Sequence, residues 1–404
     1  MVTVTPLVRR SSFIVERVRV HAEELAYLWQ RRRAARRSPE LALHDFTYLA
    51  ERIEAHLQGM LVAGEALGAM FGDVLRGDDR DEVFSAAWAL LRSGRPDNAR
   101  RVLEAFAAAD GPVIEGFADA LTMAPAVHTE ATLLAALVHG SPAHAAAAAL
   151  ALASHRRLDT SSAQFGQLLR YEDPGVAALA WRALLVLDSS PDVPRPPFAE
   201  ALRRPVAALR SAVLEVAVWR GEAWVPEAIR RLAADGDACA LGWYAALCPE
   251  DEQRAVLELL SAQPVPQRVA LAARLGRPQA LAAVLAWMAD PDPALAAAAG
   301  QAWERMTGLS VEGKRTSLPP AADADPIEED FPVELWLPDL PRAQAQWAEN
   351  GERWSAGQRW CRGFDVQTAL TSEARRRVDL EAFWDFGARA ALSGTRVFPP
   401  PAAV

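Results

Sequence analysis

Apolar residues recur along most of the chain in alanine-rich runs that are three or four helical turns long. Between Asp81 and Gly308 these runs begin at intervals of 28 to 32 residues, most of them on proline or aspartate. The runs open at Asp81, Pro112, Pro142, Pro174, Pro205, Asp237, Val265 and Pro293. A period of this length is typical of helical repeats, because a single repeat cannot bury its apolar face and has to stack on its neighbours.

A second, shorter helix is expected after each run, so that every repeat forms a hairpin of two helices. These second helices are predicted at residues 98–108, 130–138, 161–169, 198–202, 226–234, 250–260 and 278–289. Several turns carry Asp-Pro or Asp-Gly pairs, and proline suits the first helical position while aspartate caps the helix. The sequence therefore predicts an all-α fold, a right-handed α-solenoid of about eight helical hairpins.

The regions on both sides of the repeats predict helical caps. From Ile14 onwards, apolar residues step by four and three, which predicts a helix that ends in an arginine-rich run and a second helix over residues 41–60. Near the other end we find no strand pattern, and we expect helices over residues 342–352 and 372–392. The predicted domains are an N-terminal helical cap (1–80), a repeat solenoid (81–309), a linker (310–330) and a tryptophan-rich C-terminal helical cap (331–404).

The composition narrows the classes of partner. The formal net charge is −9 and the pI about 5.4, so the chain as a whole should repel nucleic acids and anionic membranes. Its three cysteines form no C-x-x-C pair, which favours reduced thiols and leaves too few ligands for a zinc site. No apolar run is long enough to span a bilayer and the first ten residues lack a secretory signal, so the expected location is the cytoplasm.

Histidines beside acids are the first candidates for catalysis or metal binding. His21 and Glu24 would meet His56 if the first two helices are antiparallel, but H-E-x-x-H spacing and a third ligand are missing. We therefore expect His21 to be a packing residue, and we expect no metal and no cofactor. The sequence contains no nucleophile elbow, P-loop or dinucleotide-binding motif, so binding is favoured over catalysis.

A repeat-built DNA glycosylase is an enzyme alternative. Such an enzyme needs a basic concave groove with aromatic residues, and Trp181, Trp219 and Trp243 lie on neighbouring predicted helices. The net negative charge argues against this alternative.

The repeat phrase Pro-x-Val/Leu-x-x-x-Ala, with its Asp-Pro turn, resembles the HEAT-like repeats of the PBS-lyase type. Residues 21–29 (HAEELAYLW), 51–59 (ERIEAHLQG) and 302–308 (AWERMTG) resemble an uncharacterised bacterial family of HEAT-repeat proteins of about this length. Members of that family are often encoded among type VI secretion genes. The resemblance implies an adaptor or chaperone of a secretion effector, or an immunity protein that binds a toxin, and it implies no catalytic residues.

The first helices of the repeats are expected to form an inner layer that binds another protein, such as an effector, a toxin or a spike component. Large residues on these helices are the candidate anchors, because tryptophan and arginine dominate binding hot spots. The candidates are Arg182, Arg210, Trp219 and Trp243, and the N-terminal arginines Arg32 and Arg36 form a second candidate patch. The alternatives are that the tryptophans belong to the core and that the N-terminal arginines are a solvated helix end.

Overall fold

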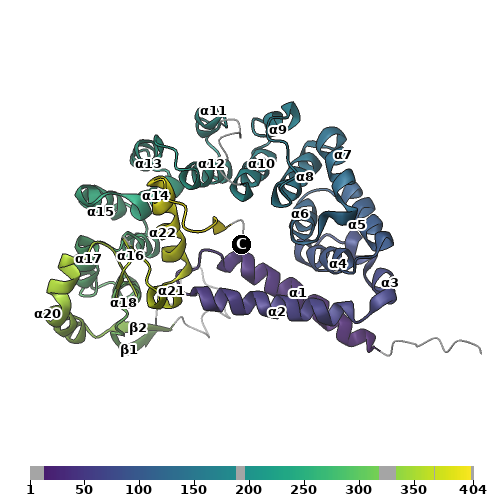
Figure 1. The fold of residues 1–404 in the computed structure, drawn as a ribbon. Coiled ribbons are helices and arrows are strands. Elements are labelled where there is room, and N and C mark those ends of the chain that lie inside the picture. Colours follow the sequence, from purple (N-terminus) through teal and green to yellow (C-terminus); the bar gives the residue numbers. More distant parts are fainter. Residues whose placement is uncertain (1–12, 188–195, 318–333, 368, 402–404) are drawn as a thin grey trace, which may run out of the picture. The chain divides into compact units, whose positions relative to one another are not determined.

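The computed structural model describes residues 13–187, 196–317, 334–367 and 369–401 (Figure 1). Across these residues the regular structure is helical apart from four short strands, so the predicted all-α class is confirmed. The chain divides into two compact units. Unit 1 contains the described residues of 13–36 and 45–216, and unit 2 contains those of 37–44 and 217–401. In the same described residues, no helix combines the length and the apolar character needed to cross a membrane.

Every predicted opening lies within two residues of the start of a helix. These first helices of the repeats are α4 (Arg80–Arg92), α6 (Val113–Met123), α8 (Pro142–Ser154), α10 (Pro174–Val186), α12 (Ala207–Trp219), α14 (Ala238–Leu247), α16 (Val265–Leu275) and α18 (Pro293–Thr307). The Asp173 carboxylate accepts hydrogen bonds from the backbone amides of Gly175 and Val176, as the predicted cap requires. The start of each repeat is therefore set by local sequence, because an N-cap side chain binds only backbone amides within the next turn.

The second helices of the repeats also lie where the sequence predicts them. They are α5 (Pro96–Ala108), α7 (Glu130–His139), α9 (Ala163–Leu168), α11 (Phe198–Leu202), α13 (Val225–Ala234), α15 (Gln253–Ser261) and α17 (Pro278–Trp287). Within unit 1, α8 packs against both α6 and α10 (Figure 1). Alanines 145–149 of α8 are all buried in this packing, and their small side chains allow neighbouring helices to approach closely.

Unit 1 begins with α1 (Val15–Ala35), which packs against α4, and it contains most of α2 (Leu43–Leu61). The glycine-rich stretch after α2 breaks into two 3₁₀ turns, η1 (Gly64–Ala66) and η2 (Val74–Arg76), on either side of α3 (Leu67–Phe71). A Cβ atom at Gly68 would lie 2.5 Å from Oδ1 of Asn98. α3 and α5 therefore approach each other closely at Gly68.

The C-terminal part of unit 2 contains the strands that the sequence did not predict. β1 (Glu312–Ser317) pairs antiparallel with β2 (Glu334–Pro338), and β3 (Trp360–Cys361) pairs with β4 (Phe364–Asp365). The prediction of a linker over 310–330 is therefore wrong for Glu312–Ser317, and residues 318–333 lie outside the described part. The side chains of β1 are mostly polar, so its sequence lacks the alternation of apolar and polar residues that predicts a strand. β2 packs against α18, and β1 is a strand because it pairs with β2.

The C-terminal helices are α20 (Leu340–Ala356), α21 (Ser372–Arg377) and α22 (Leu380–Leu392). α20 packs against α17, and β2 packs against α18. The single helix predicted over residues 372–392 is wrong, because the backbone is extended at Asp379 and its carboxylate caps α22 by accepting from the amide of Ala382. α22 packs against α14.

Candidate functional site

In each unit, the first helices of the repeats carry a terminal helix. In unit 1 this terminal helix is α1, which packs against α4, and in unit 2 it is α22, which packs against α14. We call the first helices, α4 to α18 in steps of two, the inner layer. The inner layer is the candidate functional surface, because the predicted anchors Arg182, Arg210, Trp219 and Trp243 all lie on it.

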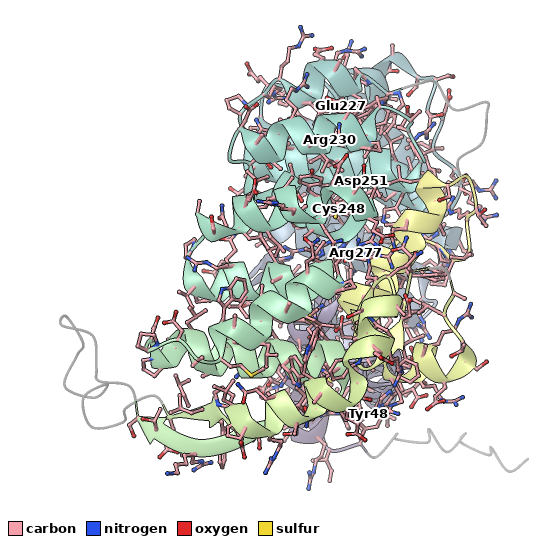
Figure 2. All side chains as sticks on the ribbon, turned by 90° about the vertical axis from the view of Figure 1, so that its left-hand side faces the viewer. Tyr48, Glu227, Arg230, Cys248, Asp251 and Arg277 are labelled. Carbon is pink, nitrogen blue, oxygen red and sulfur yellow. The ribbon has the colours of Figure 1, made fainter. Side chains whose placement is uncertain are left out.

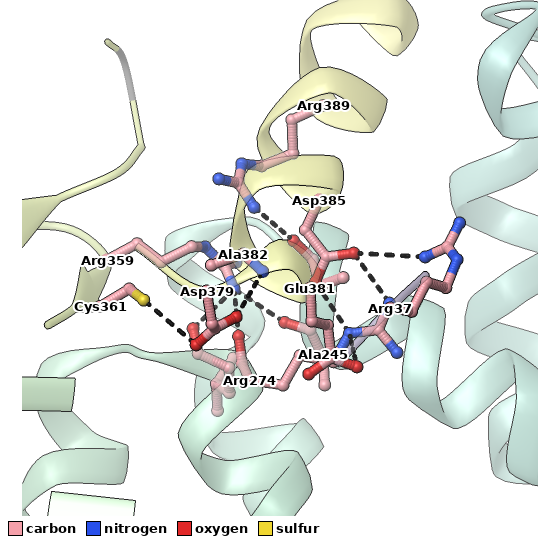
Figure 3. A network of polar contacts seen from close by, with 12 residues as sticks. Arg37, Ala245, Arg274, Arg359, Cys361, Asp379, Glu381, Ala382, Asp385 and Arg389 are labelled. Carbon is pink, nitrogen blue, oxygen red and sulfur yellow. Dashed lines mark hydrogen bonds and ion pairs between the residues drawn. The ribbon is translucent and has the colours of Figure 1, made fainter. Parts of the chain in front are cut away.

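In unit 2, carboxylates of α22 bind arginines of the inner layer (Figure 3). Arg274 of α16 donates from Nε and Nη2 to the two carboxylate oxygens of Asp385, both at 2.8 Å. Arg305 of α18 donates in the same way to Asp379, at 2.8 and 3.1 Å, and its Nη2 also donates to Glu381 at 2.8 Å. Three acids within seven residues thus attach one helix to two others.

These ion pairs are buried, and the charges in them are matched. Burial alone would lower the pKa of Arg274, but the charges of Asp385 and Glu381 outweigh it and raise that pKa above its ordinary value. Burial would likewise raise the pKa of Asp385, yet Arg274 lowers it below the ordinary range. Arg37 lies 3.8 Å from Asp385 and is a second cation beside that carboxylate. The pairs therefore stay ionised inside the protein.

Further buried arginines bind the free carbonyls at the ends of α14 and α16. Arg359 donates to the carbonyl oxygens of Ala245 and Leu275, at 2.8 and 2.6 Å. Arg277 donates to the carbonyl of Cys248 at 3.0 Å, and both residues are labelled in Figure 2. The last carbonyls of a helix have no partner within it and carry partial negative charge, so a cation is favourable there. Burial still lowers the pKa of Arg359 to about 10.

In unit 1 the charges are reversed, because the terminal helix α1 supplies the arginines and the inner layer supplies the acids. Nη2 of Arg33 donates to both carboxylate oxygens of Asp81, at 2.5 and 2.7 Å. Nε1 of Trp29 donates to Asp119 at 3.2 Å. Arg80 of the inner layer also donates to Asp119, at 3.1 Å. Asp119 therefore joins α1, α4 and α6.

The predicted N-terminal arginines belong to this arrangement. Arg32 is buried, with its guanidinium 5.3 Å from the ring centroid of Trp29 and 4.8 Å from that of Phe46. Burial lowers the pKa of Arg32 to about 10, and the charge of Arg36 contributes. The pKa of Arg36 is also lowered by burial, and the charge of Arg182 is among the contributions that lower it further. Asp119 and Glu215 raise the pKa of Arg36 in part, so this guanidinium lies among charges of both signs.

The four predicted inner-layer anchors differ in accessibility. The side chain of Arg182 is 53% exposed, and its Nη1 lies 3.8 Å from Oε2 of Glu115. Arg210 is half-buried and donates to the carbonyl of Arg204 at 3.4 Å. Trp219 and Trp243 are each only 4% exposed.

The two tryptophans pack inside unit 2, as the core alternative stated. The ring of Trp219 lies 6.3 Å from that of Phe398. The ring of Trp243 lies beneath the guanidinium groups of Arg37 and Arg274, at 4.9 and 5.6 Å. A partner would find almost no surface of either tryptophan to bind, so Arg182 is the most accessible of the four anchors.

His21 and His56 meet, as antiparallel packing of α1 and α2 requires. Their Nδ1 atoms lie 3.2 Å apart, so one ring donates a hydrogen bond to the other. The pKa of His56 is lowered by burial first and by His21 next. In the described ranges, no group of three or more histidines, cysteines, aspartates and glutamates is placed to hold a metal ion.

The residues that bind α22 were missed by sequence reasoning. Arg274, Arg305 and the acids of the Asp379-Leu-Glu-Ala-Phe-Trp-Asp385 segment carry no known motif. The sequence does contain one signal for these residues, because three carboxylates lie within seven residues at the start of a predicted helix. The prediction for this part of the chain was based on its tryptophans instead.

Comparison of the chain with protein-family models, with curated proteins and with solved structures finds no match. The resemblance to HEAT-like repeat proteins therefore stays a prediction from the sequence.

Proposed function

We propose that the protein is a non-catalytic scaffold that binds another protein on the inner layer of its helical repeats. The observation that supports this proposal most is the binding of α22 in unit 2, where inner-layer arginines bind carboxylates of a helix at 2.8 to 3.1 Å. The same layer in unit 1 carries Arg182 with a side chain that is half-exposed. A surface that binds one helix of its own chain has the chemistry to bind a helix of a partner.

The biological setting follows from the resemblance alone. We propose an adaptor or chaperone of a type VI secretion effector or spike component, acting in the cytoplasm. The second candidate is an immunity protein that binds a cognate toxin. Both candidates use the same binding surface, so they differ in the partner and in the consequence of losing it.

The glycosylase-like alternative receives less support from the site. Base recognition needs aromatic side chains that are open to a flipped base. Trp181, Trp219 and Trp243 are buried, and Nε1 of Trp181 already donates to the carbonyl of Leu169 at 3.1 Å.

Purification of the tagged protein from its native host tests the proposal. We expect a stoichiometric protein partner, encoded nearby, that dissociates at high salt because the contacts are ionic. Deletion of the gene separates the two settings: loss of effector export supports an adaptor, whereas sensitivity to a neighbouring cell's toxin supports an immunity protein. Turnover of a nucleic-acid substrate by the purified protein, without any partner, would contradict the scaffold.

A further inference from the structure

The histidine pair between α1 and α2 lies outside the inner layer. The Nδ1 atoms of His21 and His56 are 3.2 Å apart, and the two ring planes meet at 71°. Both side chains are partly exposed, so solvent reaches the pair. A nitrogen that accepts a hydrogen bond carries no proton. At least one of the two Nδ1 atoms therefore presents a free lone pair toward the other ring.

The separation of the two Nδ1 atoms is also that of two nitrogens bound to one metal ion. A bond between zinc and an imidazole nitrogen is about 2.0–2.1 Å long, so nitrogens 3.2 Å apart subtend an angle of about 100° at a shared ion. This angle is close to the tetrahedral one, which zinc prefers. The two nitrogens therefore do not need to move apart to exchange their hydrogen bond for two bonds to a metal.

Gly59, one turn after His56 on α2, fixes the position of the His21 ring. A Cβ atom at residue 59 would lie 2.5 Å from Cδ2 and 2.6 Å from Nε2 of His21. The imidazole thus occupies the space that a side chain on α2 would fill. This contact uses Cδ2 and Nε2 and leaves Nδ1 for His56. The packing that the sequence predicts for His21 is therefore what orients its second nitrogen.

The surroundings of the pair leave room for further ligands from solvent. Besides His21, the charges that act on His56 are those of Glu24 on α1 and Arg52 on α2, and they are opposite in sign. Across the described parts of the chain, no third histidine, cysteine or acid joins two others in a group that could hold a metal. An ion bound to the two rings would keep water in its other positions.

We propose that His21 and His56 form a binding site for a divalent transition metal ion such as Zn²⁺, held by both Nδ1 atoms. Imidazole is a preferred ligand of zinc, copper and nickel, whereas Mg²⁺ and Ca²⁺ prefer oxygen and should not bind here. The site does not depend on the proposed scaffold function, because no residue of the inner layer takes part.

Titration of the full-length protein with Zn²⁺, after a chelator has removed any metal, tests this site. Isothermal titration calorimetry should show saturable binding that requires both rings. His21→Ala and His56→Ala should each weaken it at least about tenfold, because each removes one of the two protein ligands. Zn²⁺ should also raise the melting temperature of the wild type but not of these variants, since a ligand of the folded state stabilises that state.

His139→Ala is the matched control, because His139 is an exposed histidine at the end of α7. This variant should bind Zn²⁺ like the wild type. Gly59→Ala keeps both histidines, but its Cβ would displace the His21 ring, so it should weaken binding as well. Circular dichroism shows whether each variant is folded.

Three results would overturn the proposal. The first is the absence of saturable Zn²⁺ binding by the wild type. The second is binding by a folded His21→Ala or His56→Ala variant that equals binding by His139→Ala, since the site needs both rings. The third is competition by Mg²⁺ at a concentration equal to that of Zn²⁺, which would indicate a site made of oxygen ligands.

Discussion

Arg305 and Asp379 lie 74 residues apart in the sequence, and they form a two-bond ion pair in the interior of unit 2. The carboxylate of Asp379 is fully buried there and has a second role, since it caps α22 by accepting from the amide of Ala382 at 2.8 Å. One side chain thus both starts the helix and attaches it to α18.

Asp379→Ala should therefore be strongly destabilising. The change leaves Arg305 buried without one of its carboxylates and removes a helix cap, which together should lower the free energy of unfolding by about 3–5 kcal/mol. Urea denaturation followed by circular dichroism measures the change. Glu373→Ala is the control, because Glu373 forms an exposed ion pair with Arg377, and it should change stability by less than about 0.5 kcal/mol. Similar losses for both variants would contradict the dual role of Asp379.

Gly387→Ala tests the tight packing of α22 inside unit 2. A Cβ atom at this position would lie 2.3 Å from Cε2 of Phe398 and 2.7 Å from Cη2 of Trp219. Aromatic rings in a packed interior cannot move aside freely, so we expect a loss of about 1–3 kcal/mol in the free energy of unfolding.

Gly166→Ala in α9 is the matched glycine control. Its Cβ would meet only the guanidinium end of Arg170, at 3.9 Å, within a helix. The added methyl group should raise stability by about 0.4–1 kcal/mol, because it restricts the unfolded chain. A Gly387→Ala protein that melts at the wild-type temperature would show that Phe398 and Trp219 do not confine this part of α22.

The stability of the protein should fall as the pH drops below the ordinary pKa of histidine. The folded-state pKa of His56 lies below 6.5, lowered by burial, then by His21 and Arg52, while Glu24 raises it in part. The unfolded chain therefore binds more protons than the folded one between that lowered pKa and 6.5, so the contribution of His56 is lost as the pH falls through this window. Melting temperatures at pH 7.5 and 5.5 measure the loss. His56→Gln should reduce this pH dependence, and an unchanged slope would contradict it.

The repeat positions were predictable because their causes are local. A proline at the start of α10 and an Asp173 cap act within one turn, so the sequence alone places the helix. The packing of α22 was not predictable in the same way, because Asp385 meets Arg274 from 111 residues away. The break at Asp379 was also missed, since the apolar pattern continues through residues 372–392 and only the long-range pair with Arg305 orients the carboxylate.

The candidate site likewise contains features that the sequence predicts and features that depend on long-range packing. Arginine and tryptophan were both reasonable anchors, because both are enriched at interfaces and tryptophan is equally common in cores. Only three-dimensional packing shows that Phe398 covers Trp219, whereas Arg182 keeps an exposed guanidinium. β1 was missed for a related reason, since its polar residues become a strand only beside β2.

An acidic peptide with the sequence of residues 378–392 tests whether the inner layer of unit 1 binds a helix, as the proposed function requires. Glu115→Gln in the full-length protein should strengthen binding of this peptide, measured by fluorescence anisotropy. Glu115 is the carboxylate nearest to Arg182, at 3.8 Å, and it competes with any carboxylate that approaches from a partner. Removing its charge should increase the affinity by about two- to fivefold, the range expected for a partly exposed ion pair. Arg80 keeps its contact with Asp119, so the inner layer should remain folded. Glu104→Gln is the control, because Glu104 pairs with Arg100 on α5, and it should leave the affinity unchanged. If Glu115→Gln weakens binding of the peptide instead, Glu115 positions Arg182 for the partner and does not compete with the partner's carboxylate.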